Sequence, residues 1–273
     1  MKKILFLALS LIYSAISFGQ DSLTVDTTSI SVAHKNEFST VKSGEFTKTV
    51  GDSAYAKNDY ASAIQIYEGL LQQGEYADLY YNLGNSYYKA DNIAKAILNY
   101  ERALLLKPGD NDIRFNLDLA RSKTVDKVEP VPEIFFVTWI KSLINCMGVN
   151  AWTKLGITFF ILLIISLSVF IFGKKLLIKK IGFISSIILF IFVVLTNIFA
   201  SQQKDSLIHR THAIVINPCV TVKSTPNESG TDLFILHEGR KVQVTDNSMK
   251  EWKEIKLEDG NVGWVPTNVI EII

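Results

Sequence analysis

Hydrophobic positions along the chain follow three kinds of pattern. Predominantly apolar runs without a charged residue occupy residues 4–16, 155–172 and 181–200. Between residues 44 and 124, apolar residues recur at spacings of three and four, which predicts amphipathic helices. From residue 209 onward, apolar and polar positions alternate in short runs divided by Gly, Pro, Asn and Asp, which predicts β-strands. The pattern therefore predicts an α + β multidomain protein with membrane segments.

The first apolar run has the features of a secretory signal peptide. Two lysines precede it, and Ser17-Phe18-Gly19 supplies small residues at the positions before a cleavage site. We expect cleavage after Gly19, so that residues 1–19 are removed. An uncleaved N-terminal anchor is the alternative, and it would have the same topology because the lysines hold that end in the cytoplasm. Residues 20–43, rich in Ser and Thr, are predicted to be a flexible linker.

The other two apolar runs predict a transmembrane hairpin. Residues 155–172 hold 18 residues without a charge and residues 181–200 hold 20, enough in each case to cross a hydrocarbon core of roughly 30 Å. The loop at 173–180 contains four lysines, which keeps it in the cytoplasm. Both large domains then lie on the outer side of the membrane. Within 125–154, a linker is followed by a helix at 134–149 that we expect on the membrane surface.

Residues 77–110 carry the spacing of a tetratricopeptide repeat. The eight marked positions are Tyr80, Leu83, Gly84, Tyr87, Ala96, Tyr100, Ala103 and Pro108. A weaker copy of this spacing precedes it, and residues 112–121 resemble a capping helix. One repeat cannot bury its own apolar face, so neighbouring repeats are required. We therefore predict an α-solenoid of about five helices at residues 44–124.

The resemblance to tetratricopeptide repeats implies a protein-binding groove on the first helices of the repeats. Its positions in this chain are Lys48, Asp52, Tyr55, Asp78, Tyr81, Asn82, Asn85, Tyr88, Lys89, Asp112, Phe115 and Asn116. Lys48 and Asn82 match a clamp that some family members use for a C-terminal carboxylate, but the other clamp positions do not match. Tyr81 and Asn85 are expected on the open face because neither is a packing position of the repeat. The alternative is a solvated helical face without a ligand.

The C-terminal region, residues 209–273, predicts a small β-barrel. Strands are expected at 213–216, 220–223, 241–245, 252–257 and 263–265, with a hairpin turn at Asp259-Gly260. The stretch Gly-Trp-Val-Pro-Thr-Asn that begins at residue 263 resembles bacterial Src-homology-3-like domains. The resemblance implies a ligand site at Trp252 and Pro266, although the tyrosines of polyproline-binding relatives are missing. A place for Trp252 and Trp264 in the barrel core is the alternative.

Composition limits the classes of function. The chain has 28 Lys and Arg residues against 27 Asp and Glu residues, which argues against nucleic acid as a partner. The four histidines and two cysteines include no metal-binding or catalytic motif. We therefore expect a protein without catalytic residues, metal or cofactor. An oxidising compartment would permit a disulfide between Cys146 and Cys219, but nothing in the sequence fixes their separation.

The order of these parts resembles the BatE-like aerotolerance family of bacterial envelope proteins. The resemblance implies an inner-membrane adaptor that acts with membrane-anchored von Willebrand factor A-domain proteins in envelope or oxidative-stress maintenance, with both large domains in the periplasm. The residues alone indicate an outward-facing scaffold in contact with a lipid bilayer. A protein that senses the cell wall or a peptide, with the barrel binding peptidoglycan, is the alternative.

Overall fold

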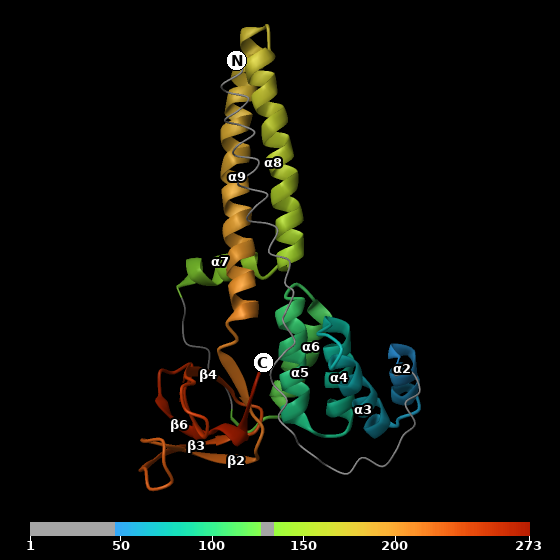
Figure 1. Ribbon diagram of the computed structural model, residues 1–273, viewed down its shortest axis with the longest axis vertical. Coiled ribbons are helices and arrows are strands. Elements are labelled where there is room, and N and C mark those ends of the chain that lie inside the picture. The colour runs from blue at the N-terminus through green and yellow to red at the C-terminus, as the bar shows by residue number, and fades with distance from the viewer. Residues whose placement is uncertain (1–46, 127–133) are drawn as a thin grey trace. The chain divides into compact units, whose positions relative to one another are not determined.

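The computed structural model describes residues 47–126 and 134–273 (Figure 1). The predicted signal peptide, the predicted linker at 20–43 and the first three residues of the predicted solenoid lie outside the described residues.

Helices occupy most of residues 47–126. They are α2 (Lys48–Ala56), α3 (Tyr60–Leu71), α4 (Ala77–Lys89), α5 (Ile93–Leu106) and α6 (Asn111–Ser122). Each helix packs against the next in sequence. In addition, α2 contacts α4, and α4 contacts α6. These contacts join α2, α4 and α6, which are the first helices of successive repeats. The prediction of five helices in this region is confirmed.

A glycine–tyrosine contact holds each helix pair together. A Cβ atom on Gly84 of α4 would lie 2.7 Å from the Tyr100 ring of α5. The same contact occurs between α2 and α3, where a Cβ atom on Gly51 would lie 2.6 Å from the Tyr67 ring. Both tyrosines are 1% exposed. The two helices of a pair can approach this closely only because one of them presents no side chain at the contact.

The turns within the two helix pairs also repeat. Asn58 and Asp91 occupy equivalent positions in these turns and have left-handed backbone conformations with φ of 62° and 61°, which Asn and Asp tolerate better than most residues. The next residue caps the following helix in each case. Asp59 accepts a hydrogen bond from Ser62 N at 3.1 Å, and Asn92 accepts one from Lys95 N at 3.1 Å.

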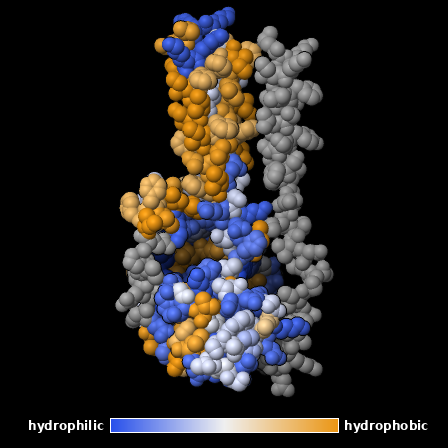
Figure 2. All heavy atoms as spheres, turned by 90° about the vertical axis from the view of Figure 1, so that its left-hand side faces the viewer, coloured by the Kyte–Doolittle hydropathy of each residue, from blue (hydrophilic) through white to orange (hydrophobic). Residues whose placement is uncertain are grey.

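Two long apolar helices, α8 (Val149–Phe172) and α9 (Leu176–Ile208), pack against each other along their length. Both are long and apolar enough to cross a membrane, and the middle of their outer surface is apolar, with hydrophilic side chains near the turn and at the opposite end (Figure 2). Small residues allow the close approach: Gly182 of α9 faces Ser166 of α8, whose Oγ donates a hydrogen bond to the Gly182 carbonyl oxygen at 2.9 Å.

The hairpin helices are longer than the apolar runs that predicted them. The turn covers only residues 173–175, because α9 already begins at Leu176 and includes two of the four lysines. Lysine is a good helix former, so the end of an apolar run does not mark the end of a helix. At the other end, α9 continues past Ala200 as far as Ile208.

The helix predicted at 134–149 is shorter in the structure, where α7 covers Phe135–Ile144 and Val149 already belongs to α8. Helix α7 exposes large apolar side chains, among them Phe135, Phe136 and Trp139. Its C-terminus is tied to the hairpin, since the Ile144 carbonyl oxygen accepts hydrogen bonds from Trp152 Nε1 of α8 at 3.0 Å and from Gln203 Nε2 of α9 at 3.1 Å.

The C-terminal region is an antiparallel sheet of seven strands within the described residues. They are β1 (His212–Val215), β2 (Cys219–Lys223), β3 (Asp232–His237), β4 (Lys241–Asp246), β5 (Trp252–Lys256), β6 (Val262–Pro266) and β7 (Ile270–Ile272), in the order β3-β2-β6-β5-β4-β1-β7. The five predicted strands are present, and β3 and β7 are additional. These two strands are the free edges, so the ladder does not close into the predicted barrel.

One face of the sheet carries its core. Val220, Val222, Leu236, Ile255 and Val265 belong to this buried apolar cluster. The two tryptophans do not: along β6 the buried positions are Gly263 and Val265, which places Trp264 on the opposite face, and Trp252 is likewise only half-buried. The interpretation of Trp252 and Trp264 as core residues is therefore wrong, because alternation along each strand turns them outward.

The sheet and the helical repeats share a core. Ile214 of β1 and the C-terminal Ile273 are buried in one cluster with Ile97 of α5. Ion pairs surround this contact. The Glu271 carboxylate of β7 pairs with Lys95 at 2.5 Å and with Arg102 at 3.1 Å, and both of these residues are on α5. The sequence suggests two separate outer domains, but the structure packs the second against the first.

A buried carboxylate lies at the centre of this contact. Glu101 of α5 has a side chain only 6% exposed, and it pairs with Arg121 of α6 and with Lys241 of β4, the latter at 2.8 Å. Burial raises the pKa of Glu101, but the two neighbouring cations outweigh burial and hold the pKa below its usual value. Glu101 therefore stays ionised and links three elements.

Candidate protein-binding groove

The predicted groove residues lie on three helices that are neighbours in space. Lys48, Asp52 and Tyr55 are on α2; Asp78, Tyr81, Asn82, Asn85, Tyr88 and Lys89 are on α4; Asp112, Phe115 and Asn116 are on α6. Because α2 contacts α4 and α4 contacts α6, residues far apart in the sequence come together on one surface. Hydrogen bonds between the helices show which of them meet.

Asp52 joins α2 to α4. Its carboxylate accepts hydrogen bonds from Asn82 Nδ2 at 3.0 Å, from the Tyr67 hydroxyl at 2.6 Å and from Lys48 Nζ at 2.8 Å. Burial raises the pKa of Asp52, but these hydrogen bonds together lower it below its usual value. Lys48 and Asn82, the two residues that match the carboxylate clamp, thus bind a carboxylate of the chain itself.

Asn116 joins α6 to α4. Its Nδ2 donates to the Tyr81 hydroxyl at 2.9 Å and to Asn85 Oδ1 at 3.1 Å. Asn85 Oδ1 also accepts a hydrogen bond from the hydroxyl of the buried Tyr100 at 2.7 Å. Asn85 is therefore part of the packing between helices, contrary to the expectation from the repeat pattern. In the preceding helix pair, Asp52 accepts the equivalent hydrogen bond from Tyr67.

The aromatic side chains differ in how far they are open to a partner. Phe115 is 68% exposed on α6, and Leu119, one turn further, is 42% exposed. Tyr55, Tyr81 and Tyr88 are half-buried. Lys123 Nζ lies 4.2 Å from the centre of the Tyr88 ring, a distance suited to a cation–π contact. Phe115 is the side chain best placed to enter an apolar pocket on a partner.

Leu119 and Lys123 are absent from the predicted groove. The spacing of four between Phe115 and Leu119 places both residues on one face of a helix, so the sequence held a signal for Leu119. The resemblance to tetratricopeptide repeats, however, implies groove positions only at Asp112, Phe115 and Asn116 of this helix. Lys123 follows the end of α6, so helical periodicity does not predict which way its side chain points.

A second surface lies on the outer face of the sheet. Trp252 of β5 and Pro266 of β6, the two predicted ligand residues, are direct cross-strand partners in the register of the sheet. Trp264 lies on the same face, opposite Glu254. Trp252, Trp264 and Pro266 therefore form a partly exposed apolar strip across two strands.

Among residues 47–126 and 134–273, no group of three or more His, Cys, Asp or Glu side chains could hold a metal ion. His209 pairs with Asp205 at 2.9 Å, and His237 pairs with Asp126 at 2.7 Å. Cys146 and Cys219 are both free thiols and exposed in this structure. His209 and His237 therefore make contacts within the fold.

Comparison with known proteins identifies the helical region. Residues 77–110 match the family model of the tetratricopeptide repeat. This segment is a tetratricopeptide repeat. The match has the same boundaries as the repeat predicted from spacing, and it covers α4, α5 and the turn that follows them. The comparison with curated proteins found no match. Repeats of this kind typically mediate binding between proteins, so a protein partner is indicated.

Proposed function

We propose that the chain is a non-enzymatic adaptor of the bacterial inner membrane that docks a protein partner on α2, α4 and α6. The observation that carries this proposal is the tetratricopeptide repeat at residues 77–110, together with the hydrogen bonds that join its first helix to α2 and α6. These bonds hold the groove in shape before a partner arrives. Preorganisation of this kind lowers the entropy lost on binding.

The groove favours an internal segment of a partner over its C-terminus. The Asp52 carboxylate already accepts hydrogen bonds from Lys48 and Asn82, so a second carboxylate would meet a negative charge at that place. Phe115, Leu119 and Tyr88 offer apolar and aromatic contact area. An extended segment or helix with apolar anchors matches this surface.

The proposed location is the inner membrane, crossed twice by α8 and α9, with both large domains in the periplasm. Two features support it: the apolar outer surface of the hairpin, and the lysines at its turn, which favour the cytoplasmic side. The apolar face of α7 suits a position at the membrane surface.

The two native cysteines provide a test of topology. In intact spheroplasts, a membrane-impermeant maleimide is expected to label both Cys146 and Cys219, because each is exposed and lies in a proposed periplasmic part. Single Cys→Ser variants separate the two signals. In a chain without native cysteines, Lys175→Cys in the turn is expected to react only after the membrane is permeabilised. Labelling of Lys175→Cys in intact spheroplasts would contradict the proposed topology.

The order of parts resembles BatE-like aerotolerance proteins, and this supports a more specific role. We propose that the partner is a membrane-anchored envelope protein, such as one with a von Willebrand factor A-domain, in a complex that maintains the envelope under oxidative stress. A partner anchored in the same membrane would meet the groove close to the membrane surface.

Phe115→Ala tests the groove. Truncation of an aromatic anchor in an interface typically lowers binding by about 2 kcal/mol, roughly thirtyfold. Crosslinking in intact cells followed by pull-down of the full chain is expected to recover the main partner with the native chain and to lose it with the variant. Because Phe115 is 68% exposed, the melting temperature is expected to stay unchanged. This change is a cleaner test than Asn85→Ala, which also removes a hydrogen-bond acceptor from Tyr100.

The alternative proposal is a sensor of the cell wall or of a peptide, with the outer face of the sheet as the binding site. The observation that favours it is the pairing of Trp252 with Pro266 beside Trp264. Trp252→Ala is expected to spare the partner bound by the groove. If Trp252→Ala abolishes partner capture and Phe115→Ala does not, the adaptor proposal is wrong and the sensor takes its place.

A further inference from the structure

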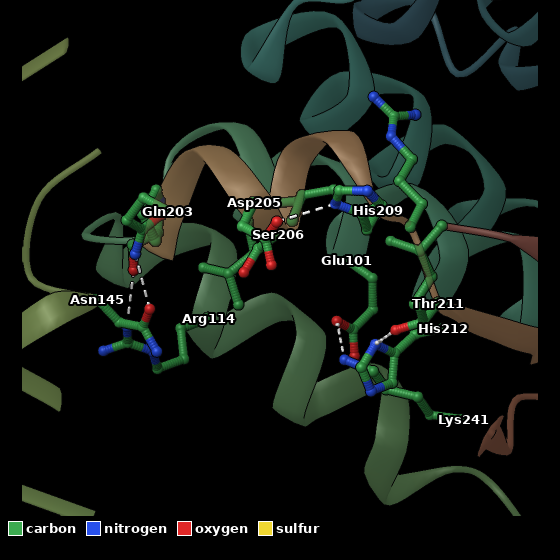
Figure 3. Close-up of a pocket in the computed structure, with 15 residues that line it drawn as sticks. Glu101, Arg114, Asn145, Gln203, Asp205, Ser206, His209, Thr211, His212 and Lys241 are labelled. Carbon is green, nitrogen blue, oxygen red and sulfur yellow. Dashed lines mark hydrogen bonds and ion pairs between the residues drawn. The ribbon is translucent and has the colours of Figure 1, made fainter. Parts of the chain in front are cut away.

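A cavity lies where α9 meets the helical repeats and the first strand of the sheet. Its volume is about 580 Å³, within the size range of small-molecule sites. Side chains from α5, α6, the segment after α7, α9, β1 and β4 line it (Figure 3). Leu104, Leu105, Pro108 and Ile273 supply apolar lining, and charged, amide, hydroxyl and imidazole side chains supply the rest.

Most charges around this cavity already have a partner. Arg210 pairs with Glu75, which lies outside the cavity, and Lys241 pairs with Glu101. Asp205 pairs with His209. These pairs hold the walls together and leave little net charge behind.

Arg114 is the exception. Its Nη2 donates one hydrogen bond, to the Pro108 carbonyl oxygen at 2.8 Å. No carboxylate lies within ion-pair distance of Arg114 in the part of the chain that the structure describes. A guanidinium has five N–H donors, so several remain for a ligand. Among the described residues that line this cavity, Arg114 thus carries a positive charge open to a ligand.

An amide donor lies at the same end of the cavity. Figure 3 shows Arg114 beside Asn145 and Gln203, away from the Glu101–Lys241 pair. Gln203 Nε2 donates to Asn145 Oδ1 at 2.8 Å. This bond fixes the orientation of the Asn145 amide and uses only its oxygen, so Asn145 Nδ2 is a donor for a ligand. A guanidinium and an amide N–H together suit an oxyanion such as phosphate.

The position of Gln203 along α9 indicates the source of such a phosphate group. The apolar run of α9 ends at Ala200, and Gln203 lies roughly one helical turn further, about 4.5 Å along the helix axis. The headgroup layer on each side of a bilayer is roughly 5–8 Å thick. If the hairpin crosses the membrane, the Arg114 end of the cavity lies at the depth of lipid headgroups, and Leu104 and Leu105 can contact the adjoining apolar part of a lipid.

We propose that this cavity binds the phosphate group of a phospholipid from the outer leaflet, with Arg114 and Asn145 as its hydrogen-bond donors. The proposal rests on the two-pass membrane location given above. A bound lipid would join the foot of the hairpin to α6, and so fix the groove helices relative to the membrane surface.

Native mass spectrometry of the full chain in detergent tests the proposal. The probes are dihexanoyl phosphatidylglycerol, dihexanoylglycerol, which lacks the phosphate, and inorganic phosphate. The native chain is expected to retain one phosphatidylglycerol and no dihexanoylglycerol. Arg114→Gln is expected to weaken retention at least tenfold, and Arg114→Lys to restore part of it. Lys204→Gln removes an exposed charge from the same region outside the cavity and is expected to change nothing.

A second variant guards against a folding defect in Arg114→Gln. Asn145→Asp keeps the oxygen that accepts from Gln203 and adds a negative charge, so it is expected to abolish lipid retention with little change in melting temperature. Equal retention of dihexanoylglycerol, or full retention by Arg114→Gln and Asn145→Asp, would overturn the proposal. Displacement of the lipid by millimolar inorganic phosphate would assign the cavity to free phosphate and overturn the lipid assignment.

The membrane location is tested separately by alkaline extraction of membranes. Release of the chain by alkali would contradict the two-pass location on which the cavity proposal rests. A chain that stays in the membrane but retains no phospholipid would overturn the cavity proposal alone and leave the adaptor proposal standing.

Discussion

Replacing Gly84 by leucine is expected to unfold the helical repeat region. A single Cβ atom at this position would already lie 2.7 Å from the Tyr100 ring and 3.3 Å from the Ala96 carbonyl oxygen. Tyr100 cannot move far because its ring is buried and its hydroxyl donates a hydrogen bond to Asn85. The Ala96 oxygen belongs to the backbone of α5 and cannot rotate away as a side chain would. Overpacking typically costs about 1–3 kcal/mol, and a whole leucine side chain in this contact is expected to reach or exceed the upper value.

The measurement is thermal unfolding of the full chain, followed by circular dichroism. Lys89→Leu places the same side chain at an exposed position of the same helix and is expected to leave the melting temperature nearly unchanged. Equal melting temperatures for Gly84→Leu and the native chain would mean that α4 and α5 do not pack through this glycine.

The second large effect is expected from Glu101→Gln. This change keeps the shape of the side chain but removes the charge that Arg121 and Lys241 share. Loss of one partner from a buried ion pair destabilises proteins by about 3–5 kcal/mol. Because both cations here are partly exposed, we expect about 3 kcal/mol, or roughly 6–12 °C in melting temperature. Glu258→Gln, the same change at an exposed position, is the control.

The pH dependence of stability gives an independent check on Glu101. Its pKa is lower in the folded chain than in the unfolded chain, where a glutamate titrates near about 4.3. Its stabilising contribution is therefore fully present above that value and is lost as the pH falls through the lower, folded value. The difference in stability between the native chain and Glu101→Gln is expected to shrink on acidification below about pH 4. A difference that stays constant with pH would contradict an ionised Glu101.

Local patterns in the sequence predicted most of the secondary structure. The residues of a tetratricopeptide repeat make contacts within one helix pair, as Gly84 does with Tyr100, and such contacts leave a regular spacing. The turns at Asn58 and Asp91 are also local, because side chains that tolerate a left-handed backbone mark them. β3 was missed although its residues alternate weakly, because its exposed apolar positions Leu233 and Ile235 blur the two-residue period.

The groove was located by sequence only in part. The spacing placed its residues on the right helices, but it treated Asn85 as a free ligand group. The hydrogen bond from Tyr100 to Asn85, and the matching bond from Tyr67 to Asp52, depend on where the second helix of each pair lies. A periodic pattern records which face of a helix a residue occupies and not which donor lies opposite.

The sequence by itself determined the parts of this protein and their order: the repeat at residues 77–110, the two long apolar helices and the strands that follow. These features arise from periods of a few residues within one segment. The tertiary structure alone decided that the sheet stays open at β3 and β7, and that Ile214 and Ile273 share a core with α5. It also decided that Glu101 binds Arg121 and Lys241. Lys241 is 140 positions away from Glu101, and no local period carries information over that separation.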